Sequence, residues 1–327
     1  MRYDVEADWQ LLNTCNYRCA YCFHSDEILG EKLKKYADPE VWSRAFDQTG
    51  LRWLVHMTGG EPGAYPGLPE LCKYLTQRHL ISINSNMTGL SWESFAQQID
   101  PDTVTFINAG LHLTERQRKN GTAIFLKNVE LLSERKFPVF TSLVMTPDAL
   151  ARFAEAKELL ATIGMFPIPK AMRGKFEEKW YPLAYTERER KLFRSYSRLA
   201  RDFYADTLAK LPERPTVDVF NDDSILDGEP NFRDLSCDAG RLFFKIEPND
   251  DVLRCGPSKS YGNILKGTLI RNDGPMPCDN GYCFYFCQKY CERPLYDSVS
   301  SSDTASDTTR RTVCGTRRPI LDLRRLW

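Results

Sequence analysis

The sequence predicts an α/β fold, a parallel sheet with helices outside it, joined to a small cysteine-rich unit. Short apolar runs alternate with helical patterns from about residue 8 to residue 170, and such alternation is typical of parallel sheets. A chain of 327 residues is long enough for one large domain and a smaller one. Its 11 cysteines are grouped, with three between residues 15 and 22 and seven between residues 237 and 314.

Six candidate strands and the helices between them have recognisable limits. A helix should begin at Asp38-Pro39, Ser91 should cap the next one, and helical patterns follow Gly121 and Asp148. Six such alternations predict a barrel, open or closed, with its active site at the carboxyl ends of the strands. The expected strands are residues 9–12, 52–57, 80–83, 103–107, 139–145 and 164–168.

We expect three successive regions along the chain. Residues 1–185 form the barrel, and residues 186–233 form a helical bridge with a long charged helix over about 186–211. Residues 234–327 are rich in cysteine, glycine, proline and asparagine, so bound metal should replace much of a hydrophobic core there.

Charge and hydropathy exclude several classes of partner. The 44 basic residues balance the 44 acidic ones, so no net field attracts nucleic acid or an anionic membrane. No apolar run approaches the length of a membrane span, and the N-terminus lacks the apolar stretch of a signal peptide. We therefore expect a cytoplasmic protein, in which disulfides are rare and grouped cysteines favour metal. Cys72 lies among apolar residues at helical spacing and is expected to be an inert buried thiol.

The first cysteine group, Cys15, Cys19 and Cys22, has the spacing C-x3-C-x2-C and follows the first strand. Thiolates are the usual ligands of iron–sulfur clusters, and three of them leave one iron of a 4Fe–4S cluster open for a substrate or cofactor. A zinc site would need a fourth ligand, and His24 is too close to Cys22 in sequence to supply it easily. The spacing therefore favours an open 4Fe–4S cluster over zinc or a disulfide.

This group resembles the signature of the radical S-adenosylmethionine (radical SAM) superfamily, in which an aromatic residue, here Tyr21, precedes the last cysteine. The resemblance covers residues 8–170 and implies a partial (β/α)6 TIM-like barrel. It also implies that the methionine nitrogen and carboxylate of S-adenosylmethionine bind the open iron. An electron from a donor such as flavodoxin or ferredoxin would then generate a 5′-deoxyadenosyl radical, which abstracts hydrogen from a substrate carbon.

Gly59, Gly60 and Glu61 belong to a Gly-Gly-Glu-Pro sequence at the end of the second strand. By itself the sequence is typical of an ordinary turn, although glycines let backbone approach a ligand and a glutamate can accept from an ammonium group. In the superfamily such a motif holds the methionine amino group, so the resemblance assigns these residues to the cofactor. It also suggests cofactor contacts for Asn86, after the third strand, and Ser142, in the fifth, where plain strand-end hydrogen bonds are the alternative.

The second cysteine group could hold one or two further clusters. Zinc ribbons are the alternative, although no C-x2-C pair occurs in this group. The region resembles the SPASM domain of many radical SAM enzymes, with Asp250 at the position of the family's glycine. The resemblance implies two auxiliary 4Fe–4S clusters, and a smaller twitch domain with one cluster is the rival. The first cluster would be held by Cys237, Cys255 and Cys291, and the second by Cys278, Cys283, Cys287 and Cys314.

Two classes of substrate are compatible with these motifs. One is a hydroxylated small molecule or sugar moiety, oxidised or epimerised at a C–H bond, with Asn108 and His112 facing it. The other is a ribosomal peptide, cross-linked or epimerised. About ten residues precede the first strand, which leaves no room there for a leader-peptide module, so the small molecule is favoured. An epimerase would need a hydrogen donor, for which Cys283 or Cys278 is the candidate. A non-catalytic iron–sulfur regulator is the alternative to an enzyme, but it would not need the Gly-Gly-Glu-Pro sequence.

Overall fold

The computed structural model describes residues 2–32, 36–89, 91–211, 219–220, 222–227, 231–256, 258–280 and 289–291, all within the unit formed by residues 1–295. Cys283, Cys287 and Cys314 lie outside the described residues. The helices are α1 (Asp26–Leu29), α2 (Pro39–Gln48), α3 (Leu68–Leu75), α4 (Trp92–Gln98), α5 (Leu113–Arg118), α6 (Thr122–Glu134), α7 (Pro147–Ala151), α8 (Phe153–Ala161), α9 (Glu187–Phe203) and α10 (Ala205–Leu208), with short 3-10 turns η1 (Pro62–Ala64), η2 (Pro101–Thr103) and η3 (Asp222–Ile225). The strands are β1 (Val5–Gln10), β2 (Trp53–Thr58), β3 (Leu80–Ser85), β4 (Val104–Gly110), β5 (Val139–Val144), β6 (Pro167–Lys170), β7 (Gly174–Phe176), β8 (Lys179–Tyr181), β9 (Ser236–Cys237), β10 (Phe243–Ile246), β11 (Asp251–Leu253), β12 (Ser260–Asn263) and β13 (Met276–Pro277).

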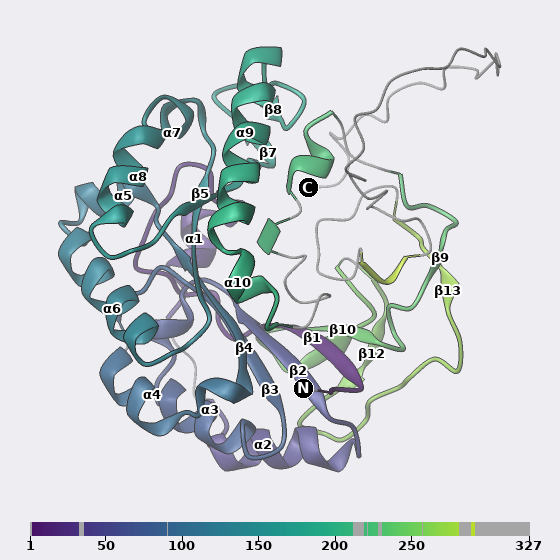
Figure 1. Cartoon of the computed structure of the whole chain (residues 1–327). Helices are drawn as coiled ribbons and strands as arrows, with labels where there is room; N and C mark the ends of the chain where they lie inside the picture. The colour runs from purple at the N-terminus through teal and green to yellow at the C-terminus, as the bar shows by residue number, and fades with distance from the viewer. Residues whose placement is uncertain are drawn as a thin grey trace, which may run out of the picture. The chain divides into compact units, whose positions relative to one another are not determined.

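Nine strands of the described residues form one sheet, in the order β12-β11-β10-β1-β2-β3-β4-β5-β6. The pairs from β10 to β6 are parallel, whereas β11 pairs antiparallel with both of its neighbours. Figure 1 shows helices α2 to α8 along the outer side of strands β1 to β5. The predicted α/β fold with a mostly parallel sheet and helices outside it is confirmed.

The first strand shows why the predicted limits differ from the observed ones. The apolar run predicted a strand over residues 9–12, whereas β1 spans Val5–Gln10. Glu6 and Asp8 interrupt the apolar pattern, yet both are buried, because they lie on the inner face of the sheet. Similarly, the run after Asp148 contains two helices, α7 and α8, and the long charged helix is α9 followed by the short α10.

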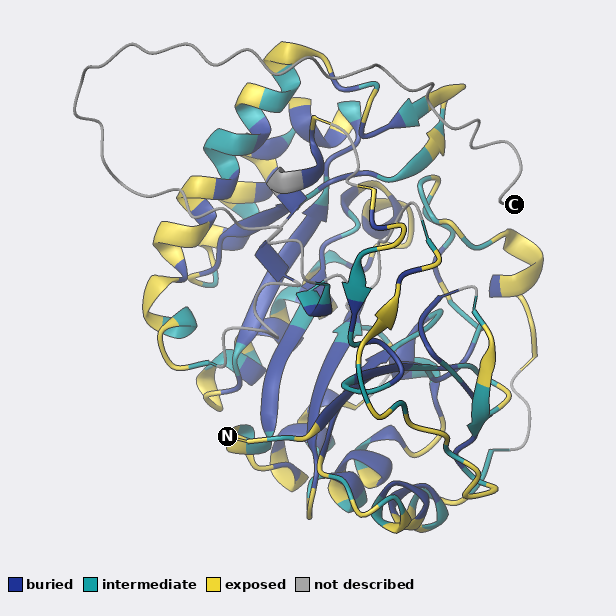
Figure 2. Cartoon of the chain, turned by 90° about the vertical axis from the view of Figure 1, so that its right-hand side faces the viewer, coloured by how far each residue is buried: buried dark blue, intermediate teal, exposed yellow. Residues whose placement is uncertain are grey.

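Apolar side chains on the outer face of the sheet hold the helices. Trp9 of β1 contacts Trp42 and Phe46 of α2, with ring centroids 4.5 and 5.5 Å apart. All three side chains are buried, and full burial of a large apolar side chain stabilises a fold by about 2–3 kcal/mol. Figure 2 shows the same pattern more widely, with buried strands and helices that are exposed along one side. This outer core therefore holds α2 against the sheet.

The inner face of the sheet carries a chain of buried polar groups instead. The Glu6 carboxylate lies 3.2 Å from Nε2 of His56, whose Nδ1 lies 2.6 Å from the Ser82 hydroxyl. The Lys289 ammonium lies 2.7 Å from the same Glu6 carboxylate, and neither side chain is more than 3% exposed. Burial raises the pKa of the Glu6 carboxyl, but Lys289 and His56 outweigh burial and hold that pKa well below its usual range.

Glu6→Gln should lower the free energy of unfolding by about 3 kcal/mol, because the buried Lys289 ammonium loses its carboxylate. Since the pKa of Glu6 is lowered in the folded chain, its contribution is complete above the unfolded-state pKa and is lost only in acid. The deficit should therefore be constant between about pH 6 and pH 8 in anaerobic urea unfolding. Glu40→Gln, which removes an exposed partner of Arg44, should have a much smaller effect. Equal losses in the two variants would contradict the role of the buried pair.

The cysteine-rich region is attached to this sheet through β10, which pairs in parallel with β1, the strand that leads into the first cysteine group. The Arg254 guanidinium donates to the carbonyls of Ala239, Met276 and Pro277 at 2.8–3.1 Å and so holds the segments of this region together. The sequence did not predict this extension of the sheet, because β10, β11 and β12 have only three or four residues each. The region limits at residues 185 and 233 stay predictions. Among the described residues, no helix is long and apolar enough to cross a membrane.

Candidate functional site

The first cysteine group lies on the loop between β1 and α1. The Cys15 amide donates to the Leu29 carbonyl (2.9 Å), and the Cys22 amide donates to the Cys19 carbonyl (2.9 Å). These bonds fold the loop back on itself, and all three thiols are half-buried and free of disulfides. Burial raises the pKa of Cys15 to about 11 and that of Cys19 to about 12, so a metal that binds here must displace protons from the thiols.

The donor atoms of this loop suit an iron–sulfur cluster. Within the described ranges, no three His, Cys, Asp or Glu side chains are placed to hold a single metal ion. A 4Fe–4S cluster binds each thiolate at a different iron, so its ligands need not converge on one point. Three thiols on one short loop therefore fit a cluster of several irons.

The Gly-Gly-Glu-Pro turn packs directly against the segment that leads into Cys15. A Cβ atom on Gly60 would lie 2.2 Å from the carbonyl oxygens of Asn13 and Thr14, so only glycine fits there. Gly59 has a φ of 134°, which L side chains rarely adopt. The sequence suggested that these glycines allow close approach of a ligand, and the structure shows that they allow close approach of two loops.

The Glu61 carboxylate fastens the same turn to the end of β3. It is buried and accepts hydrogen bonds from the Ser85 hydroxyl (2.6 Å), the Asn86 amide (2.7 Å) and the Gly63 amide (2.7 Å). Burial raises the pKa of Glu61 to about 7, against the opposing effect of these donors. A carboxylate has about four acceptor positions, and the chain itself uses three of them. The predicted contact with an ammonium group stays a prediction and would need the fourth position.

Tyr21, predicted to contact the cofactor, is held by His112. The Tyr21 hydroxyl lies 2.7 Å from Nδ1 of His112, and the Cys19 sulfur lies 3.6 Å from the same nitrogen. His112 has a left-handed φ of 42°, and its ring fills the space that a side chain on Gly110 would need. The Nδ1 of His112 thus points toward the cysteine loop, and the expectation that His112 faces substrate stays a prediction.

Asn86 and Arg116 join the strand ends to the cysteine loop. The Asn86 side-chain amide donates to Oδ1 of Asn16 within that loop (2.9 Å). The buried Arg116 guanidinium donates to the carbonyls of Asn86, Gly110 and Leu111 at 2.7–2.9 Å. Sequence analysis missed Arg116, because a single arginine in a charged helix looks like a surface residue.

Ser142 and Asn108 lie toward the carboxyl ends of β5 and β4. Ser142 is buried and pairs with Gly110 in the sheet, and its contact with a ribose stays a prediction. The Asn108 amide donates to Oδ1 of Asn84 (3.0 Å), while its own buried Oδ1 has no hydrogen-bond partner among the described residues. Since buried acceptors are normally satisfied, this oxygen is a candidate contact for a bound hydroxyl or amine.

Four cysteines of the second group lie together in a small core of their own. Cys237, Cys255 and Cys278 are buried in it, and Cys291 packs beside them. The thiols of Cys237, Cys278 and Cys291 hydrogen-bond to one another, which lowers the pKa of Cys278 and raises that of Cys291. The Asn280 amide lies 3.6 Å from the Cys255 sulfur. The structure therefore places Cys278 with the three cysteines expected at the first auxiliary cluster, which differs from the predicted division.

Asp250, at the position of the SPASM glycine, has a left-handed φ of 72°. Glycine adopts this conformation without strain, so Asp250→Gly should raise the free energy of unfolding by about 0.5 kcal/mol in urea titrations. Asp251→Gly is the matched control and should lower the stability, because Asp251 is in β11 and accepts from the Asn263 amide (3.1 Å). Destabilisation by Asp250→Gly would show that its carboxylate, and not its backbone, matters.

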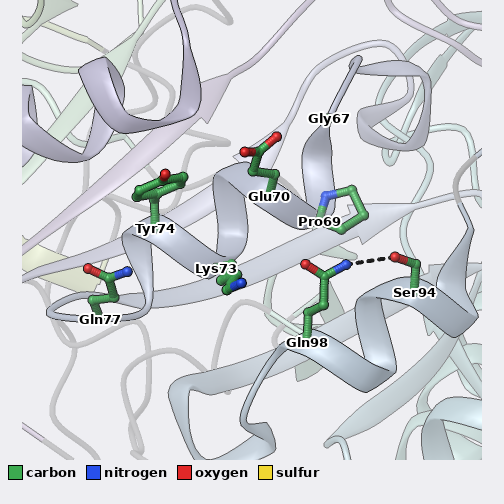
Figure 3. A pocket seen from close by; sticks show the side chains of 8 residues that line it. All are labelled: Gly67, Pro69, Glu70, Lys73, Tyr74, Gln77, Ser94 and Gln98. Atoms are coloured by element: carbon green, nitrogen blue, oxygen red, sulfur yellow. Dashed lines mark hydrogen bonds between the residues drawn. The ribbon is translucent and has the colours of Figure 1, made fainter.

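A surface cavity with a volume of about 520 Å³ lies between α3 and α4. Figure 3 shows its polar lining, with Lys73 and Glu70 on α3 and a hydrogen bond from Gln98 to Ser94 on α4. Another cavity, of about 20 Å³, adjoins the segment before Cys15. Neither is lined by a cysteine, so the thiols and not the cavities locate the chemistry.

Comparison with protein families shows what this part of the chain resembles. The model of the radical SAM superfamily matches residues 9–160, which include the cysteine loop and the Gly-Gly-Glu-Pro turn. This part of the chain is similar to a radical SAM domain. Radical SAM proteins use a 4Fe–4S cluster and S-adenosylmethionine, so the match indicates these two cofactors and an enzyme. No curated protein matches the chain.

Solved structures resemble this chain at low sequence identity. Histidine-tagged anSMEcpe with bound AdoMet is 16% identical, with a TM-score of 0.51 over 81% of this chain and 76% of its own. Streptococcus suis SuiB bound to S-adenosylmethionine is 15% identical, with a TM-score of 0.53 over 90% and 67% of the two chains. SuiB bound to the precursor peptide SuiA is 15% identical, with a TM-score of 0.52 over 92% of this chain and 67% of its own. At these identities the likeness shows the fold alone.

Proposed function

We propose that this chain is a radical SAM enzyme that abstracts hydrogen from a C–H bond of a hydroxylated small molecule and oxidises or epimerises that carbon. The observation that carries the proposal is the contact between the cysteine loop and the Gly-Gly-Glu-Pro turn, where Gly60 meets Asn13 and Thr14 with no space for a side chain. This contact fixes the turn assigned to the methionine end of the cofactor beside the loop that carries the thiols.

The chain's own residues bind and orient the cofactors. Cys15, Cys19 and Cys22 would hold the catalytic cluster, and His112 supports this loop through its contacts with Tyr21 and Cys19. When bound, the cluster and S-adenosylmethionine supply a 5′-deoxyadenosyl radical. The proposed cofactor contacts are Tyr21, Gly59, Gly60, Glu61, Asn86 and Ser142.

A hydroxylated substrate is supported by the amides at the strand ends. Asn84 and Asn108 face each other on adjacent strands, and Oδ1 of Asn108 is a buried acceptor without a partner in the described part of the chain. A substrate hydroxyl could donate to it. Because the hydrogen bonds of a buried site discriminate strongly against ligands that leave them unmade, Asn108→Leu should impair substrate turnover more than the uncoupled cleavage of S-adenosylmethionine.

A single auxiliary cluster is supported by the grouping of Cys237, Cys255, Cys278 and Cys291. Four thiolates ligate all four irons of a 4Fe–4S cluster, so this site would serve electron transfer or folding and would not ligate substrate. Cys278 is then a ligand, which leaves Cys283 as the proposed hydrogen donor of an epimerase. Cys283→Ala should still release 5′-deoxyadenosine, and continued formation of epimerised product would exclude that role.

A peptide substrate is the second candidate. It is supported by two solved structures of similar fold, SuiB with its precursor peptide SuiA and anSMEcpe with the Kp18Cys peptide. Product mass distinguishes the reactions on either substrate, because oxidation removes two hydrogens, whereas epimerisation in D₂O exchanges one hydrogen for deuterium.

The experiment that tests the proposed function uses anaerobically reconstituted protein with S-adenosylmethionine and dithionite. An enzyme of this type should release 5′-deoxyadenosine, measured by liquid chromatography and mass spectrometry. A regulatory iron–sulfur protein would bind its clusters and release none, and that result would overturn the proposal. Panels of hydroxylated small molecules and of peptides would then be compared for stimulated release.

A further inference from the structure

A group of charged side chains at the end of β6 has no part in the chemistry described so far. The Asp222 carboxylate accepts from the Lys170 ammonium (2.8 Å) and from the Ala171 backbone amide (2.6 Å). The Arg173 guanidinium lies 3.7 Å from the same carboxylate. An ammonium, a guanidinium and a backbone amide thus surround one carboxylate.

The position of this group is on the inner face of the sheet, at the end where the cysteine loop and the Gly-Gly-Glu-Pro turn also lie. Ile168 pairs with Ser142 on β5, and Lys170 lies two residues further along β6, so it projects from the same face as Ile168. The side chains of Lys170, Arg173 and Asp222 are 19%, 23% and 8% exposed. The group is therefore largely screened from water and next to strand ends that carry predicted cofactor contacts.

The carboxylate comes from a different part of the chain than its donors. Asp222 begins η3, whereas its donors come from the last residue of β6, Lys170, and from the segment directly after it, Ala171 and Arg173. Phe220 packs on Phe140 of β5, with ring centroids 5.4 Å apart, which brings this segment to the inner face. The donors thus form a site for an anion at the strand end, and a distant carboxylate fills it.

We propose that Lys170, the Ala171 amide and Arg173 bind an anionic group of the substrate, a phosphate or a carboxylate, and that Asp222 takes its place when substrate is absent. Phosphate and carboxylate oxygens can accept from the same three donors. The substrate assignment rests on the proposed function, but the anion site itself does not depend on it.

The carboxylate of S-adenosylmethionine is another anion that these three donors could bind. The superfamily resemblance assigns its carboxylate to the open iron, so it does not need the site at β6. A structural ion pair that only fastens η3 is the simplest alternative, and it predicts no binding of free anions in any variant.

The test is calorimetric titration of the reconstituted protein with inorganic phosphate and, separately, with acetate. Asp222→Asn keeps the shape of the side chain and removes its charge, and we expect it to bind phosphate about tenfold more tightly than the native chain. Asp227→Asn is the matched control, because it removes a carboxylate from an exposed pair with Arg194. It should leave phosphate affinity unchanged. Adding Lys170→Met to Asp222→Asn should abolish the binding.

The proposal would be overturned if Asp222→Asn bound phosphate no more tightly than Asp227→Asn does, and likewise acetate. If Asp222→Asn does not fold, the native chain is compared with Lys170→Met, and loss of phosphate binding only in the latter supports the site, whereas no binding to either chain overturns it. A tenfold change in S-adenosylmethionine affinity on Asp222→Asn would assign the site to the cofactor and overturn the substrate assignment. Phosphate binding without release of 5′-deoxyadenosine would support the anion site and refute the proposed function instead.

Discussion

Cys19→Ala should reduce release of 5′-deoxyadenosine to background. Removing one of three ligands leaves the catalytic cluster on two thiolates, so the loss should exceed the roughly 10–100-fold effect of changes beside a metal ligand. The sheet should remain folded, because its apolar core includes none of the three thiols. Iron analysis measures the cluster content, circular dichroism measures the fold, and chromatography measures the release of 5′-deoxyadenosine.

Cys72→Ala is the matched control for this variant. Cys72 is fully buried on α3 and contacts the sulfur of Met57 at 3.8 Å. Its replacement should cost about 1 kcal/mol of stability, as for other small losses of core volume, and leave iron content and 5′-deoxyadenosine release unchanged. Loss of iron in Cys72→Ala, or normal release in Cys19→Ala, would contradict the assignment of the catalytic ligands.

Gly60→Ala should lower the free energy of unfolding by about 3 kcal/mol and prevent loading of the catalytic cluster. The added Cβ would lie 2.2 Å from two backbone oxygens, those of Asn13 and Thr14. Backbone atoms cannot rotate away as a side chain can, so the two loops must separate, and overpacking of this kind costs about 1–3 kcal/mol or more. Since the displaced segment leads into Cys15, the thiols move with it.

Gly274→Ala is the control for this change, because a Cβ atom there meets nothing within 4 Å. It should leave both the urea midpoint and the iron content unchanged. If Gly60→Ala loads iron as the native chain does and unfolds at the same urea concentration, then the two loops do not depend on each other in the way inferred above.

The sequence predicted the outer layers of this fold well, since apolar periodicity reports packing against the helices. Trp9 of β1 and Phe46 of α2 meet in a continuous core between the sheet and the helices. The predicted start of the helix at Asp38-Pro39 is confirmed by α2. The C-x3-C-x2-C spacing also placed three thiols on one loop, because residues that are close in sequence need no knowledge of the fold.

The inner face could not be predicted in the same way. Glu6 and His56 look like surface residues in the sequence, yet both are fully buried, and the partner of Glu6 is Lys289, far along the chain. Support of the cysteine loop by His112 and Arg116 likewise depends on contacts between residues distant in sequence. Local patterns carry no information about such pairs.

The central claim is that a cluster held by the first cysteine group binds S-adenosylmethionine. Electron paramagnetic resonance of the dithionite-reduced protein, recorded with and without S-adenosylmethionine, tests it most directly. To isolate the catalytic cluster, the measurement is repeated with Cys237→Ala, which removes an auxiliary thiol. The account predicts that S-adenosylmethionine changes the spectrum of both proteins and that Cys19→Ala loses this response. A spectrum indifferent to S-adenosylmethionine, or zinc in place of iron at the loop, would contradict it.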